Sequence, residues 1–464
     1  MHHIHLHIHS HAHTRSTSMD MTSGSIARLL LAFAFPLLLG NLFQQLYNTV
    51  DVLVVGNFVG KEALAAVGST TVIVNTLVLF FNGVSIGAGV VIGQNYGAHD
   101  EKQLHLAIET TMAITFLCGV LFTFIGVSMV PFMLRFMSTP EDVLPSASVY
   151  LRIYFSGIAG LLIYNMGSGI LRAVGDTRRP LYFLCFSSVT NIVLDLVFVL
   201  VFHQGIAGVA YATIISQFLS ALLVLAYLTF SRDIYRLVWK ELRVERSILR
   251  QILVIGLPAG IQSALTCFSN VFVQSYINSF GASCMAGWSC YTKVDQFLML
   301  PLQSMGQSAT TFVSQNIGAR NVARAKKGAY TALAIAFIIA LTGAVILWTF
   351  APPIIAVFNK DPSVVEFGVL FMRLCVFFMT FCCFNQVIAG ALRGAGNAKV
   401  PMIIMLYSFV LFRQIYLFIA TRISGHPAIV GFGYPAGWMM CGTSLILYYR
   451  FSGWEKRMYR MQKE

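Results

Sequence analysis

Apolar runs separated by short polar segments recur along the whole chain. Each run is roughly 20–30 residues long, enough for a helix that rises 1.5 Å per residue to cross a bilayer core of about 30 Å. No long alternation of polar and apolar residues, the mark of strands, competes with this pattern. We predict twelve membrane-spanning helices, at residues 26–56, 64–93, 105–130, 148–172, 179–202, 205–230, 251–280, 284–314, 329–350, 366–394, 400–421 and 427–449.

The sequence repeats itself at a constant offset of 221 residues. The string Gln-Asn-Tyr-Gly-Ala at 94–98 returns as Gln-Asn-Ile-Gly-Ala at 315–319, and GILRAVGDTRRP at 169–180 returns as GALRGAGNAKVP at 390–401. A duplicated, very apolar chain is the construction of many secondary transporters, whose binding sites lie between the two halves. We therefore predict an all-α integral membrane protein in which the twelve helices form two six-helix lobes related by internal duplication.

The lobe boundaries follow from the spans. The N-lobe covers 19–230, a linker covers 231–250, the C-lobe covers 251–449, and a tail covers 450–464. The linker has six basic residues among Leu, Val, Ile and Trp, a composition that predicts an amphipathic helix on the cytoplasmic membrane surface. Seven of the eleven histidines lie in the first 13 residues. Residues 1–18 are therefore interpreted as a purification tag, with a native start at Met19 or Met21, and a natural metal-binding tract is the alternative.

Composition and charge narrow the class of protein. Hydrophobic residues make up 57% and charged residues 11% of the chain, whereas soluble domains have about 25% charged residues. Lys and Arg concentrate in the loops that follow the even-numbered spans and in the C-terminal tail, which predicts that both termini are cytoplasmic. The net charge of +13 is therefore assigned to contacts with anionic membrane lipids, and no nucleic-acid partner is expected.

Polar residues form stripes on three of the predicted spans of the first half. In span 26–56, four polar residues follow one another at spacings of three and four and therefore share one face of the helix. Tyr47 lies beside this face, one turn before the last of the four. The set is Asn41, Gln44, Asn48 and Asp51. Span 179–202 repeats the pattern with Ser188, Asn191 and Asp195, and span 64–93 carries Thr71, Asn75 and Asn82. These stripes must avoid lipid, so we expect them to face a common interior.

Three acids lie deep within apolar spans: Asp51, Asp195 and Asp295. An acid at mid-bilayer costs roughly 2.5–3.5 kcal/mol on insertion scales and usually marks an ion or proton path. Asp51 and Asp195 have Asn neighbours and no obvious basic partner, so they are interpreted as a site for Na⁺ or H⁺. Asp295 is either functional or held in a structural ion pair with Arg413.

The second half lacks the first pair of acids. Val273 stands at the repeat position of Asp51, and Tyr416 stands at that of Asp195. Its polar interior is instead expected to include Gln262 and Gln303. We therefore predict a single ion site, in the N-lobe. Pro36, which removes one hydrogen bond from the first span, is the predicted hinge.

These features resemble the multidrug and toxic compound extrusion (MATE) family, and within it the DinF-like branch. The resemblance rests on Pro36, on Gln44-x3-Asn48-x2-Asp51, and on the two pairs of repeated strings. It implies an antiporter of two six-helix bundles that open alternately to each side of the membrane and expel organic cations. It also implies an N-lobe cation site made by Asp51, Asn191, Asp195, Thr213 and the carbonyl of Val209. Thr266 and Cys382 stand where the NorM-like branch has acids, which argues against a second site.

The hypothesis is a prokaryotic inner-membrane efflux antiporter that exchanges organic cations or drugs for Na⁺ or H⁺. It is expected to need no cofactor and no metal beyond Na⁺, and to act as a monomer because the duplication supplies both halves. Ion or proton binding would pull the spans 26–56 and 179–202 together and bend the first span near Pro36. The alternatives are a lipid-linked oligosaccharide flippase, which shares the broader fold, and a membrane-embedded enzyme, for which the chain shows no catalytic motif.

Overall fold

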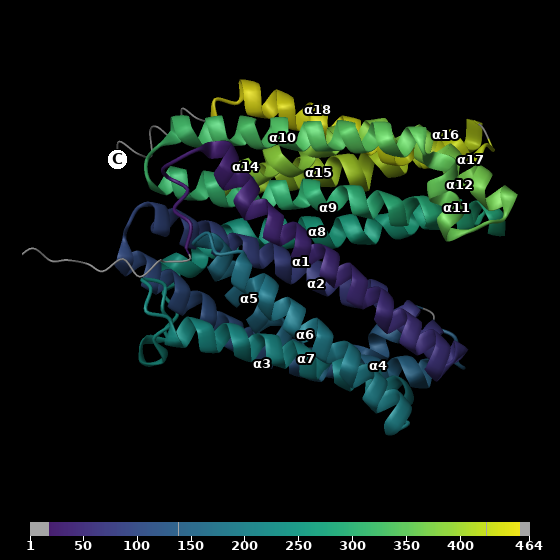
Figure 1. Cartoon of the computed structure of the whole chain (residues 1–464), viewed down its shortest axis with the longest axis horizontal. Coiled ribbons are helices and arrows are strands. Elements are labelled where there is room, and N and C mark those ends of the chain that lie inside the picture. The colour runs from purple at the N-terminus through teal and green to yellow at the C-terminus, as the bar shows by residue number, and fades with distance from the viewer. Residues whose placement is uncertain (1–17, 138, 424, 455–464) are drawn as a thin grey trace, which may run out of the picture.

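A computed structural model describes residues 18–137, 139–423 and 425–454. Residues 1–17 of the predicted tag (1–18) and residues 455–464 of the predicted tail lie outside these ranges. Within the described ranges the chain is helical and contains no strand. The helices form two groups that lie side by side and diverge toward the right of Figure 1.

The first group is the N-lobe. Its helices are α1 (Ile26–Val54), α2 (Lys61–Gly97), α3 (Glu101–Phe136), α4 (Leu144–Ser156), α5 (Ile158–Ala173), α6 (Arg178–Leu196) and α7 (Gly205–Phe230). Short π-helical turns extend α1 to Val59 and α6 to Val201. The helix α1 runs through Pro36 without a break in its assignment.

The second group is the C-lobe, whose last three crossings are built from shorter helices. Its elements are α8 (Arg246–Asn278), α9 (Ala282–Gly318), α10 (Val322–Thr349), α11 (Ala351–Phe358), α12 (Pro362–Cys375), α13 (Met379–Cys383), α14 (Ala389–Gly394), α15 (Lys399–Leu406), α16 (Arg413–Ile423), α17 (Pro427–Gly431) and α18 (Gly433–Phe451). The tenth crossing runs from α12 to α14, the eleventh from α15 to α16, and the twelfth combines α17 and α18.

The described helices match the twelve predicted spans in order. Nine of them are long and apolar enough to cross a bilayer by themselves. The pair α4 and α5 forms a tenth crossing that bends by 47° at Gly157. A Cβ at Gly157 would lie 2.4 Å from the side chain of Ile214 on α7, so the bend brings α4 and α5 against α7. The crossings α9 and α17–α18 complete the set.

The prediction of a helical linker is wrong. Residues 231–245 contain a single 3₁₀ turn, Trp239–Glu241, and helix resumes only at Arg246. The segment folds back on α7, where the Leu237 amide donates to the Leu228 carbonyl at 2.9 Å. Buried Tyr235 donates to Asp233 at 2.7 Å. These local hydrogen bonds give polar groups of the segment partners other than those that a helix would provide.

The first helix of each lobe packs partly into the other lobe. The start of α1 joins the C-lobe core through Leu30 and Phe33, and the Leu30 carbonyl accepts a hydrogen bond from Ser308 of α9 at 3.0 Å. The start of α8 joins the N-lobe core through Ile248 and Ile252. In Figure 1, α1 accordingly begins beside the C-lobe and ends within the N-lobe. The two lobes are therefore interleaved at one end.

Glycines set the closest contact between α2 and α8. Gly83 of α2 faces Gly260 of α8, and Gly87 faces Gly256, with distances from an ideal Cβ to the partner backbone of 2.3 and 2.5 Å. Small residues at these positions let transmembrane helices approach backbone to backbone. The two lobes thus meet along this line without room for side chains.

Replacing Gly87 with alanine should lower the melting temperature of the detergent-purified protein. Its new Cβ would collide with Gly256, and overpacking of this kind costs about 1–3 kcal/mol. Gly68 on the same helix is the matched control, because a Cβ there meets nothing within 4 Å. Gly68→Ala should be neutral or stabilising by up to about 1 kcal/mol. Equal melting temperatures for the two variants would contradict the packing described here.

Candidate ion-coupling site

The structure brings Asp51 and Asp195 together inside the N-lobe. They lie near the ends of α1 and α6, which pack against each other where Gly40 approaches Leu181 and Leu184. The two carboxyl groups adjoin each other closely enough to interact directly. Asp195 is fully buried and Asp51 is half-buried. Two adjacent carboxylates repel each other, so a proton or a cation between them is favoured.

Among the described residues, no basic side chain forms an ion pair with either acid. Both oxygens of Asp195 and one oxygen of Asp51 are buried without a hydrogen-bond partner, as are both side-chain atoms of Asn191 and the hydroxyl of Ser188. Buried polar groups are normally satisfied, and exceptions concentrate where a ligand or ion binds. The polar stripe of α6 therefore points at the acid pair with its bonding capacity free.

Thr213 and Val209 lie on α7, next to the stripe of α6. The Thr213 hydroxyl donates to the Val209 carbonyl at 3.0 Å, and both residues are buried. This bond leaves the Thr213 hydroxyl oxygen able to face a cation, whereas the Val209 carbonyl already accepts this bond and the backbone bond of its helix. The available donors are thus two carboxylates with neutral amide and hydroxyl oxygens. Such hard oxygen ligands suit Na⁺ or a proton rather than a transition metal.

Two tyrosines of α4 complete this region, and sequence reasoning missed them. Tyr150 is buried and interacts electrostatically with Asp51 and Asp195. Tyr154, stacked on Tyr150 with ring centroids 6.3 Å apart, adjoins Gln217 of α7. Tyr47 of α1 also interacts with Asp51, as its place beside the stripe predicts. The only signal for the α4 pair was its spacing of four residues, which is common in any buried helix.

The other predicted polar residues of these stripes divide between half-buried and exposed positions. Asn41 reaches across to the C-lobe, where its amide donates to Ser304 at 3.4 Å. Gln44 and Asn82 are half-buried, whereas Asn48, Asn75 and Gln303 are exposed on α1, α2 and α9. The structure therefore gathers only part of the predicted stripes around the acids.

Among the described residues Arg413 forms no ion pair with Asp295, which was one of the two alternatives for this acid. Buried Arg413 donates instead to Ser269 and Asn270 of α8, at 2.9 and 2.8 Å. Asp295 accepts a hydrogen bond from Tyr291 at 3.1 Å. The guanidinium also lies 4.9 Å from the ring of Tyr434. Gln262 of α8 likewise accepts a hydrogen bond from Arg393 at 2.7 Å. Neutral polar side chains of α8 thus bind these two arginines in place of an acid.

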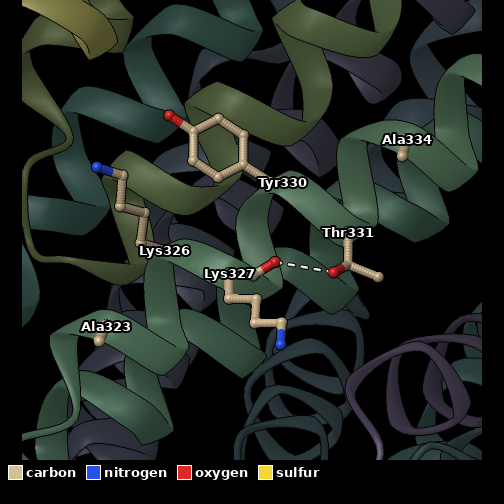
Figure 2. A pocket seen from close by; sticks show the side chains of 6 residues that line it. All are labelled: Ala323, Lys326, Lys327, Tyr330, Thr331 and Ala334. Atoms are coloured by element: carbon tan, nitrogen blue, oxygen red, sulfur yellow. Dashed lines mark hydrogen bonds between the residues drawn. The ribbon is translucent and has the colours of Figure 1, made fainter.

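A surface hollow is formed by residues of α10, which are distant in sequence from the two acids. It has a volume of about 480 Å³ and is lined by one face of α10, with Lys326, Lys327 and Tyr330 (Figure 2). A single helix face cannot enclose an organic cation, so this hollow is not assigned to substrate.

Comparison with known proteins identifies the relatives of the chain. The MatE family model matches twice, at residues 36–197 and 258–419, which confirms the internal duplication. A probable multidrug resistance protein of Bacillus subtilis, YpnP, is 31% identical over 94% of this chain and 97% of its own length. A FAD transporter of Shewanella oneidensis is 25% identical over 75% of this chain and 77% of its own length.

Solved structures share the fold. One described as an outward-facing conformation of a multidrug resistance MATE family transporter has a TM-score of 0.88 at 23% identity, over 97% of this chain and 99% of that one. Another, described as MATE in the straight conformation, has a TM-score of 0.87 at 23% identity, over 97% of this chain and all of that one. The predicted architecture of twelve helices in two six-helix lobes is confirmed.

Neutralising Asp295 should leave the stability of the protein unchanged or raise it, because this acid forms no ion pair. The comparison is Asp176→Asn, since Asp176 is buried and pairs with Arg179 at 2.6 Å. Loss of that charged hydrogen bond should cost about 1 kcal/mol or more. Thermal unfolding of Asp295→Asn and Asp176→Asn in detergent measures the difference. A larger loss for Asp295→Asn would mean that the acid has a structural partner.

Proposed function

The chain belongs to the MatE family of transporters, and from that premise we propose that it exports organic cations in exchange for Na⁺ or H⁺. The observation that supports the coupling is the acid pair. Half-buried Asp51 and buried Asp195 lie beside Asn191, and no basic side chain of the described residues forms an ion pair with either acid. A charge in this position is tolerated when a mobile cation or proton neutralises it. The pair therefore changes its charge whenever the coupling ion arrives or leaves.

The position of the two acids links this charge to the shape of the N-lobe. Asp51 lies on α1, which spans both lobes, and Asp195 lies on α6, which belongs to the N-lobe alone. A cation or proton between them removes their repulsion and draws α1 toward α6. Pro36 lies earlier on α1 and is the proposed hinge for that movement. Substrate and ion would then favour different arrangements of α1, and each would weaken the binding of the other.

The wider setting is proposed from charge and composition. Both termini would lie in the cytoplasm, in line with the excess of Lys and Arg in the loops on that side. The closed ends of the two lobes, at the ends of α2 and α9, would then face the cytoplasm. We propose a monomer in the bacterial inner membrane, in contact with anionic lipids, since one chain supplies both lobes. The substrates would be apolar organic cations and drugs.

Asp51→Asn should abolish ion-driven efflux while the protein remains folded, because asparagine keeps the shape but cannot exchange a charge. Proteoliposomes would be loaded with an ethidium-type dye and given a Na⁺ gradient or a pH gradient separately. Asp195→Asn should behave in the same way. Glu101→Gln is the matched control, because Glu101 is exposed at the start of α3 and its loss should leave efflux unchanged.

Normal efflux by Asp51→Asn under both gradients would rule out the proposed coupling. If instead the wild type expels no dye under either gradient but moves lipid-linked sugars between leaflets, the flippase alternative replaces the antiporter.

A further inference from the structure

We propose that residues 18–25, the N-terminal strap, form a latch that holds the two lobes together at their closed end. The strap precedes α1 and hydrogen-bonds to both lobes at this end. Met21 lies at its centre and is fully buried in the C-lobe core. The inference concerns how alternating access is controlled, and it rests on the proposed transport function.

The strap is bound to the C-lobe through both groups of the Met21 backbone. The Met21 amide donates to the Gln315 side-chain oxygen at 2.9 Å, and the Met21 carbonyl accepts from Asn316 at 3.1 Å. Arg324 of α10 donates to the same carbonyl at 3.3 Å and to the Gly24 carbonyl at 2.9 Å. A guanidinium that holds two backbone carbonyls fixes the direction of the strap.

The strap is bound to the N-lobe at the loop between α5 and α6. The Met19 amide donates to the Val174 carbonyl at 3.2 Å. Gly175, which has a φ of +88°, lies so close that a Cβ there would be 2.3 Å from the Met19 carbonyl oxygen. Ser18 also interacts with Tyr96 at the end of α2. Eight residues therefore join elements of both lobes.

Beneath the strap, the duplicated motifs join the lobes to each other by two equivalent hydrogen bonds. The Gln94 side chain of the N-lobe donates to the Gly394 carbonyl of the C-lobe at 3.0 Å. Its repeat mate Gln315 donates to the Ala173 carbonyl of the N-lobe at 2.8 Å. Donors and acceptors are both related by the offset of 221 residues. The structure thus assigns the repeated glutamines to the junction between the lobes.

The adjacent glycines explain why this junction is so tight. A Cβ at Gly97 would lie 1.9 Å from the Gln315 carbonyl oxygen, and a Cβ at Gly318 would lie 1.9 Å from that of Gln94. The ends of α2 and α9 therefore touch backbone to backbone. The lobes cannot separate here without breaking both glutamine bonds.

The strap adds an asymmetric element to this symmetric junction. Gln315 binds the N-lobe through its amide nitrogen and the strap through its oxygen. The linker precedes α8 of the C-lobe, but its hydrogen bonds go to helices of the N-lobe. The Glu245 amide donates to Thr110 of α3 at 3.1 Å, and Trp239 donates to Thr229 of α7 at 2.9 Å. Opening of the closed end must therefore release the strap but not the linker.

The test compares Arg324→Gln with Lys327→Gln in the full chain. Arg324→Gln removes the two bonds from the guanidinium to the strap, whereas Lys327 lies one turn along the same helix, exposed in the hollow of Figure 2. Hydrogen exchange of residues 18–25 reports the latch directly through the Met19 and Met21 amides. We expect exchange at least roughly tenfold faster in Arg324→Gln, since loss of even one charged hydrogen bond has an effect of that size, and no change in Lys327→Gln.

A second measurement reports the opening of the junction itself. Ser314 is fully buried, and its hydroxyl faces Gly93 across the two lobes. A Ser314→Cys variant should react with a polar thiol reagent only while the closed end is open. The quantity compared is the labelling of Ser314→Cys in excess of that of the protein without this substitution. We expect this excess to rise severalfold when Arg324→Gln is combined with Ser314→Cys, and not when Lys327→Gln is.

Unchanged strap exchange in Arg324→Gln, or faster exchange without any rise in Ser314→Cys labelling, would overturn the latch. Neither readout needs a transported substrate, so a failure of the proposed function leaves this result interpretable. If Arg324→Gln does not fold, Asn316→Ala tests the latch by the same two readouts, because it removes the side-chain bond to the Met21 carbonyl. A rise in both strap exchange and Ser314→Cys labelling supports the latch, and no rise overturns it.

Discussion

The coupling proposed for this transporter depends on two neighbouring carboxyl groups inside the N-lobe. Among the described residues, no basic side chain forms an ion pair with either of them. Repulsion between such groups is strong where water is scarce, so the arrangement of α1 and α6 must differ between the charged and the neutralised pair. The neighbouring Asn191 and Ser188 contribute polar atoms without partners in the protein. This region therefore has an incomplete set of interactions that an ion or proton can complete, and Val273 and Tyr416 stand at the positions of the two acids in the C-lobe.

Gene duplication explains both the symmetry and the asymmetry of the molecule. The two halves keep the residues that form the junction between the lobes, because each lobe supplies one glutamine and one glycine to the other. They differ in the membrane interior, where Val273 and Tyr416 replace the acids. In the C-lobe, Arg413 bonds neutral groups of α8, Ser269 and Asn270, rather than an acid. A transporter built this way can move both lobes while only one of them senses the coupling ion.

Most of the architecture could be predicted from sequence because the bilayer imposes length and hydrophobicity on every crossing. The acid pair was also predictable, since polar residues at spacings of three and four must share a face and avoid lipid. Tyr150 and Tyr154 were not, because an aromatic pair on a helix has the same spacing whether it packs in a core or lines a site. The contact between Arg413 and α8 was missed because charge alone suggested Asp295 as its partner. The linker was misjudged because its composition suits a surface helix, whereas local bonds of Asp233 and Tyr235 determine its backbone.

The most direct test of the central claim is the affinity of the purified protein for an ethidium-type cation, measured across Na⁺ concentration and pH. Competition at the acid pair predicts that the affinity falls as the concentration of the coupling ion rises, and that this dependence disappears in Asp51→Asn. An affinity that is the same at every Na⁺ concentration and every pH in the wild type would contradict the account.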